Sequence, residues 1–142
     1  MQEIQVCREC GALHEQGSCE EIFHRILAME YDSPRLLAEH FKTVACYTIQ
    51  HLAAYTSEAI QGLIETLREQ LEEGLRITEI RNRNSRLYEG SKRVYKDQSD
   101  IKIELRRWPM TIQDVWQEDN GDAIAQKVVQ WAQSIVDHCL SK

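Results

Sequence analysis

Apolar side chains recur at helical spacing in the first third of the chain. Between Glu20 and Tyr31 they fall on one side of a predicted first helix. These positions are Ile22, Phe23, Ile26, Leu27 and Met29. Ser33 as N-cap and Pro34 at the first helical position then predict the start of a second helix.

The second predicted helix runs from about Pro34 to Leu52. Its inward stripe consists of Leu37, Phe41, Val44, Thr48 and Leu52, and its flank carries His40, Tyr47 and His51. Because the turn at residues 32–34 is short, we expect the first two helices to pack antiparallel.

A third helix is predicted from about Ser57 to Glu73, where Gly74 is placed to end it. The helical period is lost over residues 75–110. The sequence there fits a hairpin over residues 86–96. Alternating apolar positions also predict a short strand at Ile101, Ile103 and Leu105.

Helical signals return near the C-terminus. Thr111 and Asp114 have the spacing of a capping box that opens a short helix through Trp116, and Asn120 can cap a last helix from Gly121 to Leu140. Its wide apolar face contains Ile124, Val128, Val129, Trp131, Ala132, Ile135, Val136 and Cys139. The predicted fold class is mainly α, a small helical bundle with a short irregular or β segment around residues 80–107.

The composition, with 42% hydrophobic and 28% charged residues, is that of a globular protein. No apolar run approaches the roughly 20 residues that span a bilayer, so no membrane partner is expected. The N-terminus has no basic patch followed by an apolar stretch, so a secretory signal is not predicted. The cytoplasm is the expected location.

The net charge of −6 is unevenly distributed along the chain. Residues 76–107 contain ten Lys or Arg and five acidic residues. Such a basic stretch can bind nucleic acid, but an acidic chain repels phosphate overall, and charged runs usually only solvate a loop. Nucleic acid is therefore not the favoured partner.

Five cysteines, an odd number, argue against a disulfide framework and for reduced thiols that bind metal or fill the core. In Cys7-Arg8-Glu9-Cys10-Gly11, two intervening residues let both thiolates reach one ion. The glycine permits a tight turn whose amides can hydrogen-bond to the sulfurs. A metal site is the favoured interpretation, ahead of a redox dithiol or an inert pair.

A closed tetrahedral site needs two more ligands. The candidates are His14, Cys19, His24, His40, Cys46, His51, His138 and Cys139. On the first helix Cys19 extends the apolar stripe, whereas His24 falls roughly 130° from its centre and faces water.

The second helix offers three of these candidates. In an antiparallel pair, Cys19 lies near the level of residue 47, and His51 is one turn closer to the Cys7 loop. Cys46 is at a similar level but on the opposite face, so it ranks below His51. His40 is roughly 16 Å from His51 along the helix axis, too far to share one ion.

The preferred metal site is therefore Cys7, Cys10, Cys19 and His51, a set that favours zinc over hard cations. The alternatives are that Cys19 is a small core residue and that His51 is a histidine bonded to a backbone carbonyl. Tyr47 and Gln50 are candidates to hold the ligands in place. We expect one helical domain over residues 1–142, with a zinc knuckle at 1–19, helices at 20–74, a basic segment at 75–110 and C-terminal helices at 111–142.

His40 remains as a titratable side chain that could pair with a group on another helix. A hydrogen-bonded histidine is the favoured interpretation over a catalytic one. No GxSxG, HExxH, phosphate-binding glycine loop or paired-carboxylate motif appears in the sequence. No catalytic residue is therefore assigned.

Taken together, these motifs resemble a family of small, mostly bacterial proteins of unknown function that open with a CPxCG knuckle and carry a DxYxxQHP stretch on a helix. The positions that match are Cys7, Cys10, Cys19, His40, Tyr47, Gln50 and His51. Ala45 stands where the family usually has an acidic residue, and Leu52 stands where it usually has proline. The resemblance implies no activity.

The leading hypothesis is a zinc-binding protein in which the metal stabilises a helical bundle that acts through an undetermined partner. One alternative is a hydrolase-like enzyme whose zinc keeps an open position, assisted by His40 or Tyr47. Another is a sensor of metal or oxidants that acts through its thiolates. Homo-oligomer formation is left open.

Overall fold

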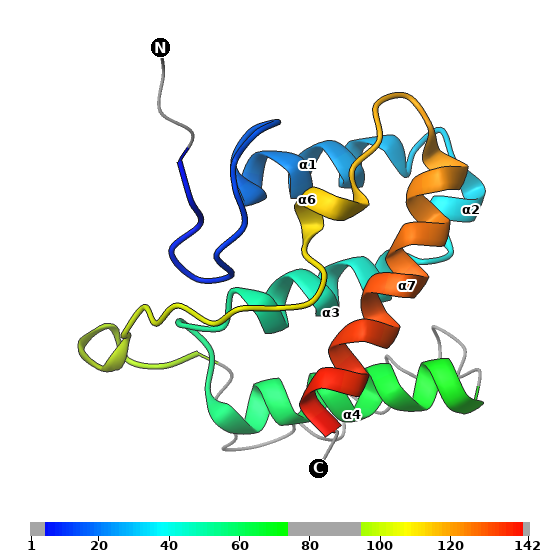
Figure 1. The fold of residues 1–142 in the computed structure, drawn as a ribbon. Coiled ribbons are helices and arrows are strands. Elements are labelled where there is room, and N and C mark those ends of the chain that lie inside the picture. Colours follow the sequence, from blue (N-terminus) through cyan, green and yellow to red (C-terminus); the bar gives the residue numbers. More distant parts are fainter. Residues whose placement is uncertain (1–4, 74–94, 141–142) are drawn as a thin grey trace.

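The computed structural model describes residues 5–73 and 95–140 and is mainly helical, as the sequence predicts. The elements are α1 (Cys19–Met29), α2 (Pro34–Leu37), α3 (His40–Gln50), α4 (Ser57–Glu73), the short 3-10 helix η1 (Gln98–Asp100), α6 (Ile112–Val115) and α7 (Gly121–Leu140). Helix α7 crosses the molecule and contacts α2, α3, α4 and α6 (Figure 1).

Helix α1 begins where a side chain can cap it. The Ser18 hydroxyl accepts a hydrogen bond from the Glu21 amide at 3.1 Å, which satisfies one of the free amides of the first turn. The buried face consists of Cys19, Ile22 and Ile26. Helix α1 packs against α6, and it reaches α3 through Phe23, whose ring stacks on Tyr47 with centroids 4.1 Å apart.

The predicted second helix is broken in two. Ser33 and Pro34 start α2 as predicted, but α2 ends at Leu37 and α3 begins at His40. The break resets the angular phase, so positions on either side of it do not share a face. The predicted inward stripe is therefore wrong at Leu37, which is 52% exposed, whereas Thr48 is buried and Phe41 and Leu52 pack partly buried against the core. The buried residues of α2 and α3 are Leu36, Lys42, Thr43, Ala45, Cys46, Thr48, Ile49 and Gln50.

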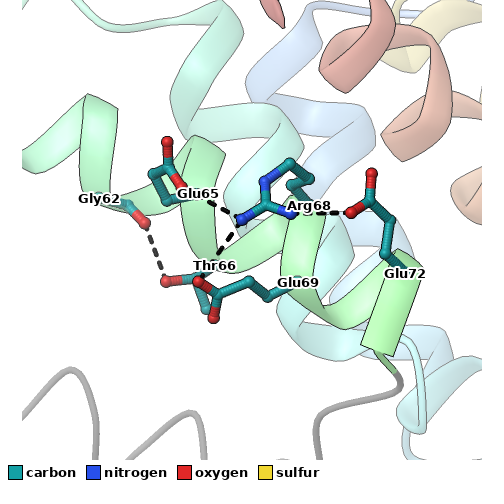
Figure 2. A network of polar contacts seen from close by, with 6 residues as sticks. All are labelled: Gly62, Glu65, Thr66, Arg68, Glu69 and Glu72. Atoms are coloured by element: carbon teal, nitrogen blue, oxygen red, sulfur yellow. Dashed lines mark hydrogen bonds and ion pairs between the residues drawn. The ribbon is translucent and has the colours of Figure 1, made fainter.

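Helix α4 has the predicted bounds and carries a network of polar contacts, in which Thr66 and Glu69 are buried (Figure 2). Arg68 forms ion pairs three, one and four residues away, with Glu65, Glu69 and Glu72. The Thr66 hydroxyl donates to the Gly62 carbonyl at 2.8 Å. Because such pairs within one helix each contribute little to stability, they support the helix rather than build a site.

The segment that follows α4 does not bear out the predicted strand. Residues 101–107 form no strand, and Ile103 and Leu105 are 57% and 52% exposed. Alternating apolar residues need a neighbouring strand to bury one face, and none is found beside this segment among residues 5–73 and 95–140. The predicted hairpin over residues 86–96 and the predicted helix end at Gly74 lie outside the described residues, except for Tyr95 and Lys96.

The C-terminal helices begin at the predicted caps. The Thr111 amide donates to the Asp114 carboxylate at 2.9 Å, which completes the capping box of α6. The Ala123 amide donates to the Asn120 side chain at 3.0 Å at the start of α7. The buried residues of α7 are Ile124, Ala125, Val128, Trp131, Ala132, Ile135 and Val136, whereas Val129 is 39% exposed.

A buried polar contact joins α3 and α7 inside the core. The Trp131 indole donates to the Gln50 side chain at 3.1 Å, and Gln50 in turn donates to the Met110 carbonyl at 2.7 Å. Both side chains are almost completely buried. In the part of the chain that the structure describes, no helix has both the length and the apolar character needed to cross a membrane.

Candidate metal centre

The Cys7 loop is a tight turn closed by its own backbone. The Cys7 amide donates to the Ala12 carbonyl at 2.8 Å, and the Gly11 amide donates to the Cys7 carbonyl at 3.0 Å. Gly11 has a φ of +76°, in the left-handed region that glycine adopts without strain. The Cys10 amide points at the Cys7 sulfur at 3.5 Å, as the CxxCG motif predicts. The turn therefore places both thiols on one side.

The fold brings the four predicted residues together. Cys7 and Cys10 lie in this turn, Cys19 is the first residue of α1, and His51 is the C-cap of α3. One ligand atom from each, three sulfurs and an imidazole nitrogen, lie within 4.8 Å of one another. The three cysteines are 8%, 2% and 3% exposed, so the thiols are buried, whereas His51 is half-buried.

Two of the six distances between the donor atoms match those around a tetrahedral ion, and all six are within 4.8 Å. Zinc bonds of about 2.3 Å to sulfur and about 2.0 Å to nitrogen imply separations of roughly 3.8 Å between sulfurs and roughly 3.6 Å between sulfur and nitrogen. The Cys10 and Cys19 sulfurs are 3.7 Å apart, and the Cys7 sulfur is 3.5 Å from His51 Nε2. All three cysteines are free thiols. The donor set and its spacing therefore suit zinc.

The His51 ring is fixed by two contacts. Its Nδ1 donates to the Tyr47 carbonyl at 2.8 Å, which leaves Nε2 directed at the cluster. The Tyr47 ring stacks on the imidazole with centroids 4.3 Å apart. A carbonyl acceptor behind a histidine ligand is a common way to set its tautomer. The predicted supporting role of Tyr47 is thus met, whereas Gln50 makes its hydrogen bonds with Met110 and Trp131.

Two further side chains contact the Cys19 sulfur. Gln113 Nε2 and His14 Nε2 each lie 3.8 Å from it, and Gln113 Nε2 also donates to the Gly17 carbonyl at 2.9 Å. Gln113 was not among the residues predicted for the site. The feature of the sequence that could have indicated Gln113 is its position in the first turn of α6, next to the capping box. Helix α6 packs against α1, which begins at Cys19.

Proton positions in the cluster follow from the crowding of three sulfurs. Hydrogen bonds from Cys10 and Cys19 lower the pKa of Cys7 well below its ordinary value. Hydrogen bonds with Cys19 and Cys7 and burial raise the pKa of Cys10. The bond with Cys10 lowers the pKa of Cys19, but the bond with Cys7 and burial outweigh it and raise the pKa to about 11.

The same sulfurs shift the pKa of the His51 imidazole. Burial lowers the pKa of His51, but hydrogen bonds with Cys10 and Cys7 outweigh burial and raise the pKa to about 10. Burial also raises the pKa of the Tyr47 hydroxyl, which keeps it protonated at neutral pH. A cation at the centre would take the place of the protons on the cysteines and His51.

The remaining candidate ligands lie elsewhere. His24 is exposed, as predicted, and the His138 ring contacts Trp108. Cys46 is completely buried, and burial raises its pKa well above the ordinary value. Cys46 was predicted on the face opposite the inward stripe, and that face is itself in the core, where Ala45, Ile49 and Gln50 are also buried. Cys139 is half-buried.

His40 lies at the opposite end of α3 from the cluster, about 16 Å from His51 along the helix axis. Its Nδ1 contacts both carboxylate oxygens of Glu30, at 2.7 and 3.0 Å. Glu30 follows α1, so the sequence expectation that His40 pairs with a group on another element is confirmed.

A family model described as a family of unknown function, DUF5946, matches residues 5–139 of the chain. No curated protein and no solved structure matches it. The match covers every residue of the cluster.

Proposed function

The chain belongs to the DUF5946 family, whose function is unknown, and we propose that it is a zinc-binding protein whose metal has a structural role. Cys7, Cys10, Cys19 and His51 hold the ion in a closed tetrahedral site. Three sulfurs and one imidazole are typical of structural zinc, whereas catalytic zinc keeps one position for water. The ion ties the Cys7 loop to the start of α1 and the end of α3.

The observation that carries this proposal is the agreement between donor spacing and zinc geometry. Two independent separations, 3.7 Å between sulfurs and 3.5 Å between sulfur and nitrogen, lie within about 0.1 Å of the tetrahedral values. The donors come from three separate elements, so local sequence alone does not produce this spacing. Free thiols at these distances also fit a reducing compartment, which supports the cytoplasm as the location.

The geometry gives less support to a metal-dependent enzyme. His40 is paired with Glu30 at the far end of α3, and therefore does not reach the ion. The Tyr47 ring is stacked between Phe23 and His51, and burial raises the pKa of its hydroxyl, which disfavours the phenolate that a general base needs.

The proposal is tested by metal analysis of protein purified without added metal. We expect about one equivalent of zinc in the wild-type chain. Cys19→Ser should lower the zinc content to less than a few tenths of an equivalent because it removes a ligand. Cys139→Ser is the matched control, since this thiol lies outside the cluster, and it should keep the wild-type zinc content.

Two results would contradict this proposal. Wild-type protein without a transition metal would remove the zinc site altogether. Release of the ion by mild peroxide, with recovery after reduction, would favour a thiol sensor over a structural role, because buried zinc-bound sulfurs in a structural site should resist oxidation.

A further inference from the structure

Each sulfur of the metal centre faces an N–H group. The Cys10 amide lies 3.5 Å from the Cys7 sulfur, and the Ala12 amide hydrogen-bonds to the Cys10 sulfur. Both of these donors belong to the backbone of the Cys7 loop. The sulfur of Cys19 differs, because a side chain from another element, Gln113 Nε2, lies 3.8 Å from it. The hydrogen bond to Cys19 is therefore one that a substitution can remove.

The orientation of the Gln113 amide follows from its second contact. Gln113 Nε2 donates to the Gly17 carbonyl at 2.9 Å. Because a carbonyl can only accept, the nitrogen and not the oxygen of the amide lies on this side. The nitrogen carries two protons, so one is available for Gly17 and the other for the Cys19 sulfur. His14 Nε2 lies at the same distance from that sulfur but donates only when it carries the proton.

Helix α6 holds Gln113 in place. Gln113 lies in its first turn, between Thr111 and Asp114, which form the capping box. Directly before this turn, the Met110 carbonyl accepts from Gln50 at 2.7 Å. Helix α6 also packs against both α1 and α7. The Gln113 side chain is therefore presented to the metal centre by a segment that is fixed on several sides.

The charge of a loaded site explains why such a donor matters. One zinc dication faces three thiolates and a neutral imidazole, so one negative charge is left over on the sulfurs. The three thiols are buried, and water therefore solvates that charge poorly. Hydrogen bonds from N–H groups to the sulfurs stabilise the charged form instead. Loss of the donor to Cys19 should raise the free energy of the metal-bound state.

We propose that Gln113 is a positioning residue of the metal centre, whose amide hydrogen-bonds to the Cys19 thiolate and raises the affinity for the ion. This inference rests on the proposed zinc site. The two residues are 94 positions apart in sequence, so the bond also makes tight metal binding depend on α6 being docked against α1.

The first test is the zinc affinity, measured by competition with a chromophoric chelator. Gln113→Leu should weaken zinc binding by about tenfold to 100-fold, because it removes the donor to a ligand. Gln113→Glu keeps the shape of the side chain but loses the N–H groups and adds a negative charge, so it should weaken binding at least as much. Gln133→Leu is the matched control, since Gln133 is exposed on α7 and bonds to Asp137, and it should keep the wild-type affinity.

The second test separates the hydrogen bond from a packing role of Gln113. Cobalt replaces zinc, and the sulfur-to-cobalt charge-transfer band is recorded with each protein fully loaded. A hydrogen bond lowers the energy of the electrons on sulfur, so its loss should move the band to longer wavelength in Gln113→Leu and Gln113→Glu. Gln133→Leu should show the wild-type band. Circular dichroism verifies that each variant folds, and Gln113→Glu alone suffices if Gln113→Leu does not.

Two results would overturn the inference and leave the zinc site intact. One is wild-type zinc affinity in the folded Gln113 variants. The other is a weakened affinity with an unmoved charge-transfer band at full loading, which would reduce Gln113 to a packing residue. A wild-type protein that binds no zinc would remove the proposed site and this inference together. That failure is recognised in the wild type itself, before any variant is compared.

Discussion

The Glu30 carboxylate is nearly buried, with 6% of its side chain exposed, while its partner His40 remains 48% exposed. Burial raises the pKa of Glu30, and the hydrogen bond from His40 only partly opposes this effect. A carboxyl whose pKa is higher in the folded than in the unfolded state stabilises the fold most when it is protonated. The pair therefore gives the protein a pH dependence that is independent of the metal centre.

Glu30→Gln tests this pH dependence. The contribution of Glu30 to stability is fully present below the ordinary glutamate pKa of 4.5 and is lost as the pH rises through the higher folded value. Glutamine resembles the protonated acid and does not titrate. The free energy of unfolding of the wild type, minus that of Glu30→Gln, should therefore fall between pH 4 and pH 7. Urea denaturation of both proteins at each pH measures it.

Comparing the two proteins at each pH cancels any acid loss of metal, which affects both alike. A difference that rises with pH would mean that the ion pair with His40 dominates over burial, and the assignment of the pKa shift would be wrong.

At the scale of elements, the contact between Gln50 and Trp131 fastens α3 to α7 in the centre of the core. Gln50→Leu should lower the free energy of unfolding by about 1–3 kcal/mol, because it leaves the buried Trp131 donor and the Met110 carbonyl unpaired. Gln133→Leu is the control. Gln133 is exposed on α7 and bonds only within its helix, so the change should be within about 0.5 kcal/mol.

Equal stability of the two variants in chemical denaturation would show that the buried amide contributes nothing beyond its volume. A zinc content unchanged in Gln50→Leu would further separate this core contact from the neighbouring His51.

The elements that the sequence predicted best are those with local end signals. Ser33, Thr111 and Asn120 each cap the helix that follows them, since capping depends on a few adjacent residues. The break between Leu37 and His40 carried no such signal, because neither proline nor glycine occurs there. The prediction of one continuous helix therefore placed Leu37 on the inward stripe, although it is exposed, and did not show that the side of α3 that carries Cys46 is also buried.

The four residues of the candidate site were nevertheless chosen correctly as neighbours. Their approach depends on position along the helix axes, because Cys19 begins α1 and His51 follows α3. An error in the predicted rotation of a helix about its axis does not change the position of a residue along that axis. The contacts of Gln113 and His14 could not be foreseen in this way, since they depend on how α6 and the Cys7 loop pack against α1.

At the scale of the whole molecule, the proposed ion joins parts of the chain that are more than 30 residues apart in sequence. A ligand that binds only the folded state at about 1,000 times its dissociation constant adds about 4 kcal/mol of stability. For a chain of this size, that corresponds to a rise of roughly 10 °C in Tm. Removal of zinc by a chelator should lower Tm by that order, as measured by circular dichroism.

Cys19→Ser is the control for this prediction. It should unfold near the temperature of the chelated wild type, and the chelator should have little further effect on it. A wild-type Tm that does not change on chelation would mean that the ion does not stabilise the fold.

The central claim concerns the atoms around the metal, and zinc K-edge X-ray absorption of the purified protein measures them directly. The structure predicts three sulfurs at about 2.3 Å and one nitrogen at about 2.0 Å, with no water in the shell. A shell dominated by oxygen or nitrogen, or a protein that cannot be loaded with zinc, would contradict the assignment of Cys7, Cys10, Cys19 and His51 as its ligands.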